Sequence, residues 1–139
     1  MLKEVNKILV ACDELLAAQR FSVGNDLVFI PDFKLSFNEQ FKNKAYTIDE
    51  IAYCEQFDDS LLHYASTWAA KEAVYKAVKQ LDTSPLGPKK IEILRKKIGG
   101  QPYVSIKKDQ SELSISLTIS HDGDYAWAIA FIDLNTPAK

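Results

Sequence analysis

A long helical segment, residues 58–81, most constrains the fold, because its apolar side chains lie on two sides of one predicted helix. With successive residues about 100° apart around the axis, one broad face carries small residues: Ala69, Ala70, Ala73, Val74 and Ala77. The opposite side carries larger ones: Leu61, Tyr64, Trp68 and Tyr75. A helix that is apolar on both sides is usually buried on both sides. The small face predicts close packing against a sheet, and the larger side chains need a partner of their own.

Helices are predicted mainly before this segment and strands mainly after it. The predicted helices are 2–19, a short one beginning at Thr47, and 58–81, with 32–45 ambiguous. The predicted strands are 21–30, 89–98, 102–108, 112–120 and 125–134, with a turn at 121–124. Gly24 and Asn25 predict a break in the first strand and Pro31 its end, while Thr47 and Glu50 have capping-box spacing. This order predicts the α+β class, with an antiparallel sheet packed against the long helix.

The composition predicts one domain over residues 1–139, with 1–19 as an additional N-terminal helix, since 139 residues can bury a core. A net charge of −2 argues against nucleic-acid binding. No apolar run is long enough to span a membrane, and acids interrupt the apolar residues of the N-terminus, unlike a signal peptide. Cys12 and Cys54 fit neither a CxxC motif nor a disulfide framework, so we expect buried free thiols and a cytoplasmic protein.

Glu72 lies beside the stripe of larger side chains, where a carboxylate needs a cation. The helix geometry alone favours an ion pair with Lys76, which is four residues further along the chain. A second interpretation makes Glu72 one of two carboxylates that bind a metal, with Lys76 contacting a phosphate on the same side. That interpretation requires another acid from a different element.

Asp26 is the candidate for that second acid, because an aspartate is unfavourable within an apolar strand. The alternative is a turn residue that caps its own backbone. Two carboxylates completed by water and phosphate oxygens form a site that suits Mg²⁺. His121 follows a strictly alternating strand, where a histidine is more often a local hydrogen-bonding residue than a ligand.

Together and in this order, these segments resemble the 4′-phosphopantetheinyl transferases, in particular the short holo-acyl-carrier-protein synthase type. The matching motifs are Gly24-Asn25-Asp26-Leu27-Val28-Phe29-Ile30; Phe41, Lys44, Tyr46, Thr47 and Glu50; Trp68-Ala69-Ala70-Lys71-Glu72-Ala73-Val74-Tyr75-Lys76-Ala77; Gly100-Gln101-Pro102; and Thr118-Ile119-Ser120-His121 with Tyr125-Ala126. The helix motif is the most specific of the five, and the match extends over residues 21–132.

The resemblance implies an enzyme that moves the phosphopantetheine arm of coenzyme A onto a serine of an apo acyl carrier protein and releases adenosine 3′,5′-bisphosphate. It implies that Asp26, Glu72 and Lys76 are catalytic, with Asp26 and Glu72 as Mg²⁺ ligands. For the general base we expect Glu72 or a metal-bound water that it orients. The residues implied for coenzyme A binding are Lys71, Lys76, Gly100, Gln101, Pro102 and His121. The family also implies a homotrimer with shared sites, in which a neighbour or the bound pantetheine covers the larger side chains of the long helix.

Five features depart from the family pattern. Three are single residues: Phe29 replaces an acid, Asp32 replaces the basic residue with which the family docks the acidic carrier, and Gln101 replaces a lysine or arginine. The other two are the segment DTSPLGP (82–88), which replaces a Gly-Thr-Gly loop, and the extra N-terminal helix. Lys34, Lys42 and Lys44 could replace the docking charge. The mixed charge of the extra helix favours a docked helix over a free arm. The carrier could therefore belong to fatty-acid synthesis or to a polyketide pathway.

Two other functions stay open from the sequence. One is a module that binds coenzyme A or a carrier protein without turnover, and the other is a different Mg²⁺-dependent nucleotide enzyme. The retained set of Asp26, Glu72, Lys76 and His121 argues against the first, since a degenerate site usually loses its charges.

Overall fold

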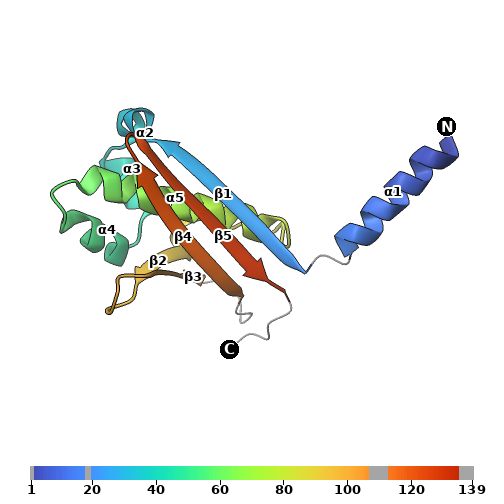
Figure 1. The fold of residues 1–139 in the computed structure, drawn as a ribbon. Coiled ribbons are helices and arrows are strands. Elements are labelled where there is room, and N and C mark those ends of the chain that lie inside the picture. The colour runs from blue at the N-terminus through green and yellow to red at the C-terminus, as the bar shows by residue number, and fades with distance from the viewer. Residues whose placement is uncertain (1, 18–19, 107–112, 135–139) are drawn as a thin grey trace.

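A long helix crosses one face of a three-stranded antiparallel sheet, with short helices and a β-hairpin around it (Figure 1). The computed structural model describes residues 2–17, 20–106 and 113–134. The helices are α1 (Leu2–Ala17), α2 (Ile30–Ser36), α3 (Glu39–Ala45), α4 (Ile48–Glu55), α5 (Ser60–Lys79) and the 3-10 helix η1 (Pro88–Lys90). The strands are β1 (Phe21–Phe29), β2 (Ile91–Arg95), β3 (Pro102–Ile106), β4 (Ser114–Asp122) and β5 (Tyr125–Asp133). The strand orders β1-β5-β4 and β2-β3 confirm the predicted α+β class.

Strand β1 runs through Gly24 and Asn25 without the predicted break and pairs with β5 along its whole length. Gly24 serves close packing instead, because a Cβ there would collide with the Ala73 carbonyl and lie 2.6 Å from the Ala77 amide nitrogen. Beside it, the Ser22 hydroxyl donates to the Ala77 carbonyl at 2.7 Å. The small-residue face of α5 is therefore buried against the sheet, as predicted, and a glycine lets the two backbones approach.

The larger side chains of α5 are covered by the chain's own α2 and α3 region. Tyr64 is only 1% exposed, and its ring centroid lies 4.7 Å from that of Phe37. The Trp68 ring lies 5.0 Å from the Phe41 ring. The ambiguous segment thus forms two short helices whose aromatic side chains cover this stripe. The expectation that a neighbouring subunit or ligand covers Tyr64 is therefore wrong, whereas Trp68 stays partly buried and Tyr75 is 37% exposed.

The last two strands form a hairpin with a shorter turn than predicted. Strand β4 continues through His121 to Asp122, which pairs with Tyr125. Only Gly123 and Asp124 connect the strands, and Gly123 has a φ of 56°, which glycine adopts without strain. His121 therefore belongs to a strand at the end of the sheet.

The sheet face that points away from α5 is apolar, and we call it the outer sheet face. The large apolar side chains on it, between 39% and 60% exposed, are Phe21, Val23, Leu27, Phe29, Tyr125, Trp127 and Phe131. The Phe21 and Phe131 rings lie 5.2 Å apart, as do the Phe29 and Tyr125 rings. A contiguous apolar face of this kind marks an interaction surface.

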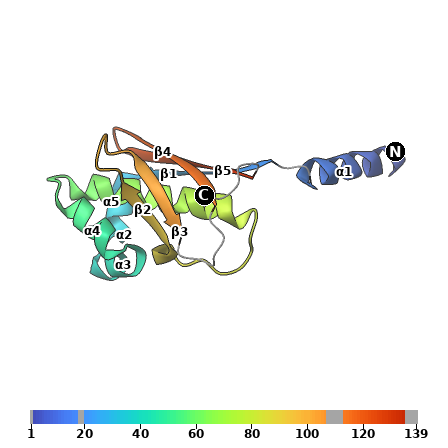
Figure 2. The same ribbon diagram turned by 90° about the horizontal axis from the view of Figure 1, so that it is seen from below.

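Helix α1 stands away from the rest of the described chain (Figures 1 and 2). Within the described chain α1 is not docked on the sheet, and the apolar side chains whose exposure the structure describes are exposed, with Leu2 at 79% and Ile8 at 63%. The predicted burial of Cys12 concerns a side chain outside the described residues. No helix within the described ranges is long and apolar enough to cross a membrane.

Candidate functional site

Asp26 and Lys76 form an ion pair where β1 crosses α5. An Asp26 carboxylate oxygen lies 2.8 Å from the Lys76 ammonium, which also donates to the Asn25 carbonyl at 3.1 Å. Asp26 faces α5 because it lies two residues after Gly24 on the same side of the strand. It is therefore a strand residue and no turn cap. Lys76 reaches the strand, so the simple intrahelical pair with Glu72 is not what the fold forms.

The Glu72 carboxylate lies next to this pair and has no hydrogen-bond or ion-pair partner among the residues that the structure describes. Burial raises the pKa of Glu72, the negative charge of Asp26 raises it further, and the positive charge of Lys76 lowers it. The two carboxylates are thus close enough to repel each other, and one ammonium acts on both negative charges. An additional cation at this position would relieve that repulsion.

A pocket of about 240 Å³ opens beside Glu72, between α5 and the segment that leads into β2. Its lining residues are Trp68, Lys71, Glu72, Tyr75, Leu86, Pro88 and Ile91. The Asp82 carboxylate accepts a hydrogen bond from the Ser84 amide at 2.9 Å and so fixes the DTSPLGP segment. That segment supplies an apolar wall through Leu86, which is 7% exposed. A mostly apolar wall with few polar groups is typical of small-molecule sites.

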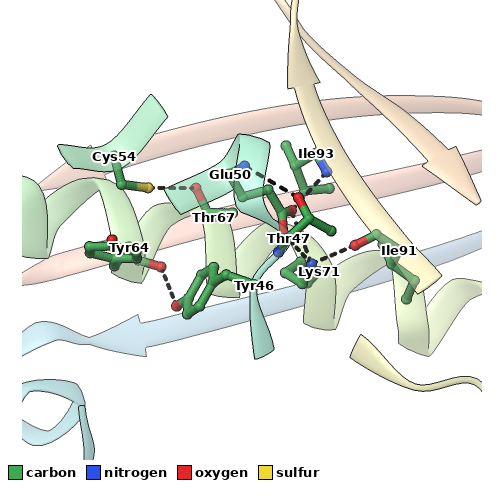
Figure 3. Close-up of polar contacts among 9 residues, drawn as sticks. All are labelled: Tyr46, Thr47, Glu50, Cys54, Tyr64, Thr67, Lys71, Ile91 and Ile93. Atoms are coloured by element: carbon green, nitrogen blue, oxygen red, sulfur yellow. Dashed lines mark hydrogen bonds and ion pairs between the residues drawn. The ribbon is translucent and has the colours of Figure 1, made fainter. Parts of the chain in front are cut away.

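Lys71, which is one of the residues that line this pocket, forms a buried ion pair with Glu50 (Figure 3). The Lys71 ammonium lies 2.7 Å and 2.9 Å from the two Glu50 carboxylate oxygens and donates to the Ile91 carbonyl. Glu50 also accepts from the amides of Thr47, at 2.8 Å, and Ile93, at 2.9 Å. Lysine has three N–H groups, and all three are used inside the fold. This geometry argues against the predicted phosphate contact of Lys71.

Cys54 lies in the same interior region (Figure 3) and is confirmed as a buried free thiol. Its sulfur lies 3.8 Å from the Thr67 hydroxyl oxygen. Burial raises the pKa of Cys54 to about 11, so the thiol stays protonated near neutral pH. It has no part in the candidate chemistry.

The other predicted site residues lie elsewhere in the chain. Residues 100–102 are at the tip of the β2–β3 hairpin, where Pro102 pairs with Arg95. Strand β5 lies between β1 and β4, and Asp26 pairs with Ala128 whereas His121 pairs with Ala126. His121 is therefore two strands away from Asp26 and nearer the end of the β4–β5 hairpin. The structure thus brings together Asp26, Glu72 and Lys76, but not the hairpin tip or His121.

Two contributions to this region were not predicted from the sequence. Leu86 and Pro88 form part of the pocket wall, and the only signal was a single leucine among turn-forming residues. Glu50 was identified as a capping residue, which is correct, but its carboxylate also holds Lys71 and the Ile93 amide of β2. No spacing in the sequence links Glu50 to β2, because these contacts depend on the tertiary packing.

Comparison with known proteins covers most of the chain. A family model described as the 4′-phosphopantetheinyl transferase superfamily matches residues 22–130. The chain belongs to this superfamily. This transferase is 33% identical over 120 residues to the holo-[acyl-carrier-protein] synthase of Wolbachia pipientis subsp. Culex pipiens (strain wPip), which covers 81% of this chain and 96% of that protein. It is also 37% identical over 120 residues to the fatty acid synthase alpha subunit hexA of Dothistroma septosporum, covering 85% of this chain but 36% of that protein.

Two solved structures share the fold of this transferase. One is the Chronobacterium ammoniagenes ACPS-CoA complex, with a TM-score of 0.71 and 28% identity over 83% of this chain and 98% of that chain. The other is the Helicobacter pylori holo-[acyl-carrier-protein] synthase in complex with coenzyme A, with a TM-score of 0.69 and 26% identity over 80% and 99%. Helix α1 precedes the region that the family model matches.

Proposed function

We propose that this transferase moves the 4′-phosphopantetheine arm of coenzyme A onto a serine of an apo acyl carrier protein and releases adenosine 3′,5′-bisphosphate. The observation that carries the proposal is the meeting of Asp26, Glu72 and Lys76 beside the pocket, in a chain of this superfamily. The printed names of the relatives support the substrates, since the Wolbachia protein is a holo-[acyl-carrier-protein] synthase and both solved structures contain coenzyme A.

The donors of this site fit Mg²⁺. Asp26 and Glu72 offer carboxylate oxygens, and Mg²⁺ commonly uses one or two carboxylates together with water and substrate phosphate oxygens. Glu72 has no hydrogen-bond or ion-pair partner in the described structure, and burial and the charge of Asp26 raise its pKa, so its carboxylate oxygens can bind a cation that would offset the charge of both acids. When bound, Mg²⁺ would supply positive charge that stabilises the phosphate oxygens of the transition state.

The chain's own residues then position the substrate and move a proton. Lys76, half exposed at the edge of the site, binds a phosphate oxygen of coenzyme A. Glu72 accepts the proton of the carrier serine, directly or through a water, as the serine oxygen bonds to the phosphorus of the pantetheine arm. The bond from that phosphorus to the bridging oxygen breaks, and the electron pair leaves with adenosine 3′,5′-bisphosphate. A carboxylate within hydrogen-bond reach of the attacking hydroxyl, directly or through one water, is suited to this proton transfer.

A homotrimer accounts for the predicted residues that lie away from this cluster. The outer sheet face is apolar and is enlarged by Phe29, which stands where the family pattern has an acid. Burial of this face between copies would stabilise the assembly. In the assembly, residues 100–102 and His121 of one copy complete the coenzyme A site of its neighbour. Lys71 supports the site from the interior and does not touch the phosphates.

The carrier is an acidic protein docked near α2 and α3. Lys42 is already paired with Glu39 at 2.9 Å and with Glu55 at 3.2 Å, so its charge is matched within the chain. Lys34 and Lys44 are the exposed alternatives, while Asp32 opposes them. The fatty acid synthase among the relatives supports a carrier of fatty-acid synthesis.

A transfer assay tests the proposal. The protein is incubated with coenzyme A, Mg²⁺ and a panel of fatty-acid and polyketide apo carriers, and each carrier is weighed by mass spectrometry. We expect addition of one phosphopantetheine to a fatty-acid carrier, and loss of that addition in Asp26→Asn and Glu72→Gln. Tight coenzyme A binding without transfer to any carrier would instead identify a binding module. Hydrolysis of nucleotides without a carrier would identify a different enzyme.

A further inference from the structure

Helix α1 is strongly amphipathic, and no other element in the part of the chain that the structure describes covers it. In the described part of its surface, Leu2, Val5, Ile8 and Leu9 are exposed by 79%, 46%, 63% and 56%. The views of Figures 1 and 2 agree that α1 projects away from the sheet and the other helices. An isolated helix of 16 residues is marginal in water, since most helical stability in proteins comes from packing of the apolar face. Helix α1 therefore needs a partner to be stable.

The sequence of α1 shows what kind of partner fits. Apolar residues recur at alternating steps of three and four, which is the spacing of a coiled-coil seam: Leu2, Val5, Leu9, Cys12 and Leu16. Ile8 and Leu15 widen this seam on one flank, and a widened seam favours a bundle of several helices. Lys3, Lys7 and Glu14 lie on the opposite side of the helix. This pattern is that of a helix which packs against other helices.

The charge of α1 disfavours two other occupants. Residues 2–17 contain two lysines and three acids, whereas helices that bind membrane surfaces carry a basic polar face. An acidic carrier protein would likewise be repelled. A copy of the same helix carries lysines as well as acids, so opposite charges on two copies can pair.

The position of α1 favours another copy of this chain. Only residues 18–20 separate α1 from β1, whose outward side chains Phe21, Val23 and Leu27 belong to the outer sheet face. Copies that associate through this face bring their α1 helices to the same end of the assembly, where tethering raises their effective concentration. We propose that the α1 helices of neighbouring copies pack on one another as a short bundle that extends the interface of the outer sheet face.

Two adjacent residues provide a matched test. Leu9 and Val10 are both 56% exposed, but Leu9 lies on the apolar stripe and Val10 about 100° away on the polar side. In the full-length protein, Leu9→Lys should weaken self-association in sedimentation equilibrium at least tenfold and reduce the helical circular dichroism signal. Val10→Lys should change neither. Equal behaviour of the two variants would overturn the proposal.

Cross-linking identifies the occupant directly. In a Cys12→Ser background, where the remaining native thiol Cys54 is buried, Leu9→Cys should form disulfide-linked dimers on mild oxidation. Val10→Cys should form at least tenfold fewer. Equal cross-linking at both positions, or binding of the wild type but not of Leu9→Lys to phosphatidylcholine–phosphatidylglycerol vesicles, would also overturn the proposal. None of these measurements depends on transferase activity. Their outcome therefore tests the α1 bundle separately from the proposed transferase function.

Discussion

Lys71 and Glu50 form an ion pair that is sealed in the interior, with side-chain exposures of 1% and 0%. The pair joins three elements, because Glu50 lies on α4, Lys71 lies on α5, and both hydrogen-bond to the backbone of β2. Burying two charges is costly, and the cost is offset only when every donor and acceptor is satisfied. Here the pair fixes β2 against α5 and so holds Ile91 in the wall of the pocket.

Replacing Lys71 by Met should destabilise the fold by about 3–5 kcal/mol, because it leaves the Glu50 carboxylate buried without a counter-charge. Chemical denaturation in urea measures this loss. The matched variant Lys76→Met, at a half-exposed pair, should cost about 1 kcal/mol or less. A Lys71→Met variant that is as stable as the wild type but binds coenzyme A more weakly would contradict this structural role. It would support the phosphate contact first predicted for Lys71.

Replacing Gly24 by Ala should destabilise the protein by about 1–3 kcal/mol, the usual effect of overpacking. The added methyl group would meet the backbone of α5 at Ala73 and Ala77, so β1 must shift, and Asp26 with it. Thermal unfolding measures the loss, and the transfer assay should show a lower rate. Gly87→Ala is the control, since a Cβ there meets nothing within 4 Å. Equal effects of the two substitutions would contradict the role given to Gly24.

The sequence predicted the acids of the site better than their surroundings. Asp26 and Glu72 could be assigned to one site because each is an acid among apolar residues, where a carboxylate needs a cation. The fold places both at the β1–α5 crossing. The prediction of a strand break at Gly24 was wrong. A glycine that lets a strand pack closely against a helix backbone cannot be distinguished in the sequence from a glycine that lets the chain bend. The cover over Trp68 was missed for a similar reason. Phe41 reaches it from a segment with no clear periodicity, so only tertiary packing reveals the contact.

Glu72 should make stability depend on pH in a defined direction. Its pKa in the folded protein is raised above the ordinary value of 4.5, so the folded state holds this proton more tightly than the unfolded state. The resulting stabilisation is complete below the unfolded pKa and is lost as pH rises through the folded pKa. Glu72→Gln should therefore be more stable than the wild type at neutral pH, and this advantage should shrink toward pH 4 (about the ordinary carboxyl value).

Unfolding temperatures measured across this pH range test the expectation, with Asp58→Asn at an exposed carboxylate as the control. Added Mg²⁺ should raise the unfolding temperature of the wild type but not of Glu72→Gln, because a ligand stabilises only the state that binds it. An advantage of Glu72→Gln that is constant with pH would show that its charge is not the cause.

Cys54 should resist thiol reagents in the folded protein. Its pKa is raised to about 11, so only about a thousandth of it is thiolate at pH 8, and its side chain is fully buried. In a Cys12→Ser variant, Ellman's reagent should detect one thiol in urea and essentially none under native conditions. Rapid native labelling would mean that the α4–α5 contact opens frequently.

Lys76 should influence the pH dependence of transfer through Glu72. Its positive charge lowers the pKa of Glu72, so Lys76→Met should raise that pKa and move the acid limb of the rate profile to higher pH. It should also raise the KM for coenzyme A by about tenfold, the equivalent of one charge-assisted hydrogen bond of about 1.5 kcal/mol. Lys76→Arg keeps the charge and should leave the acid limb in place. A KM increase in Lys76→Met with an unchanged acid limb would show that Lys76 binds phosphate while Glu72 is not the group that accepts the serine proton.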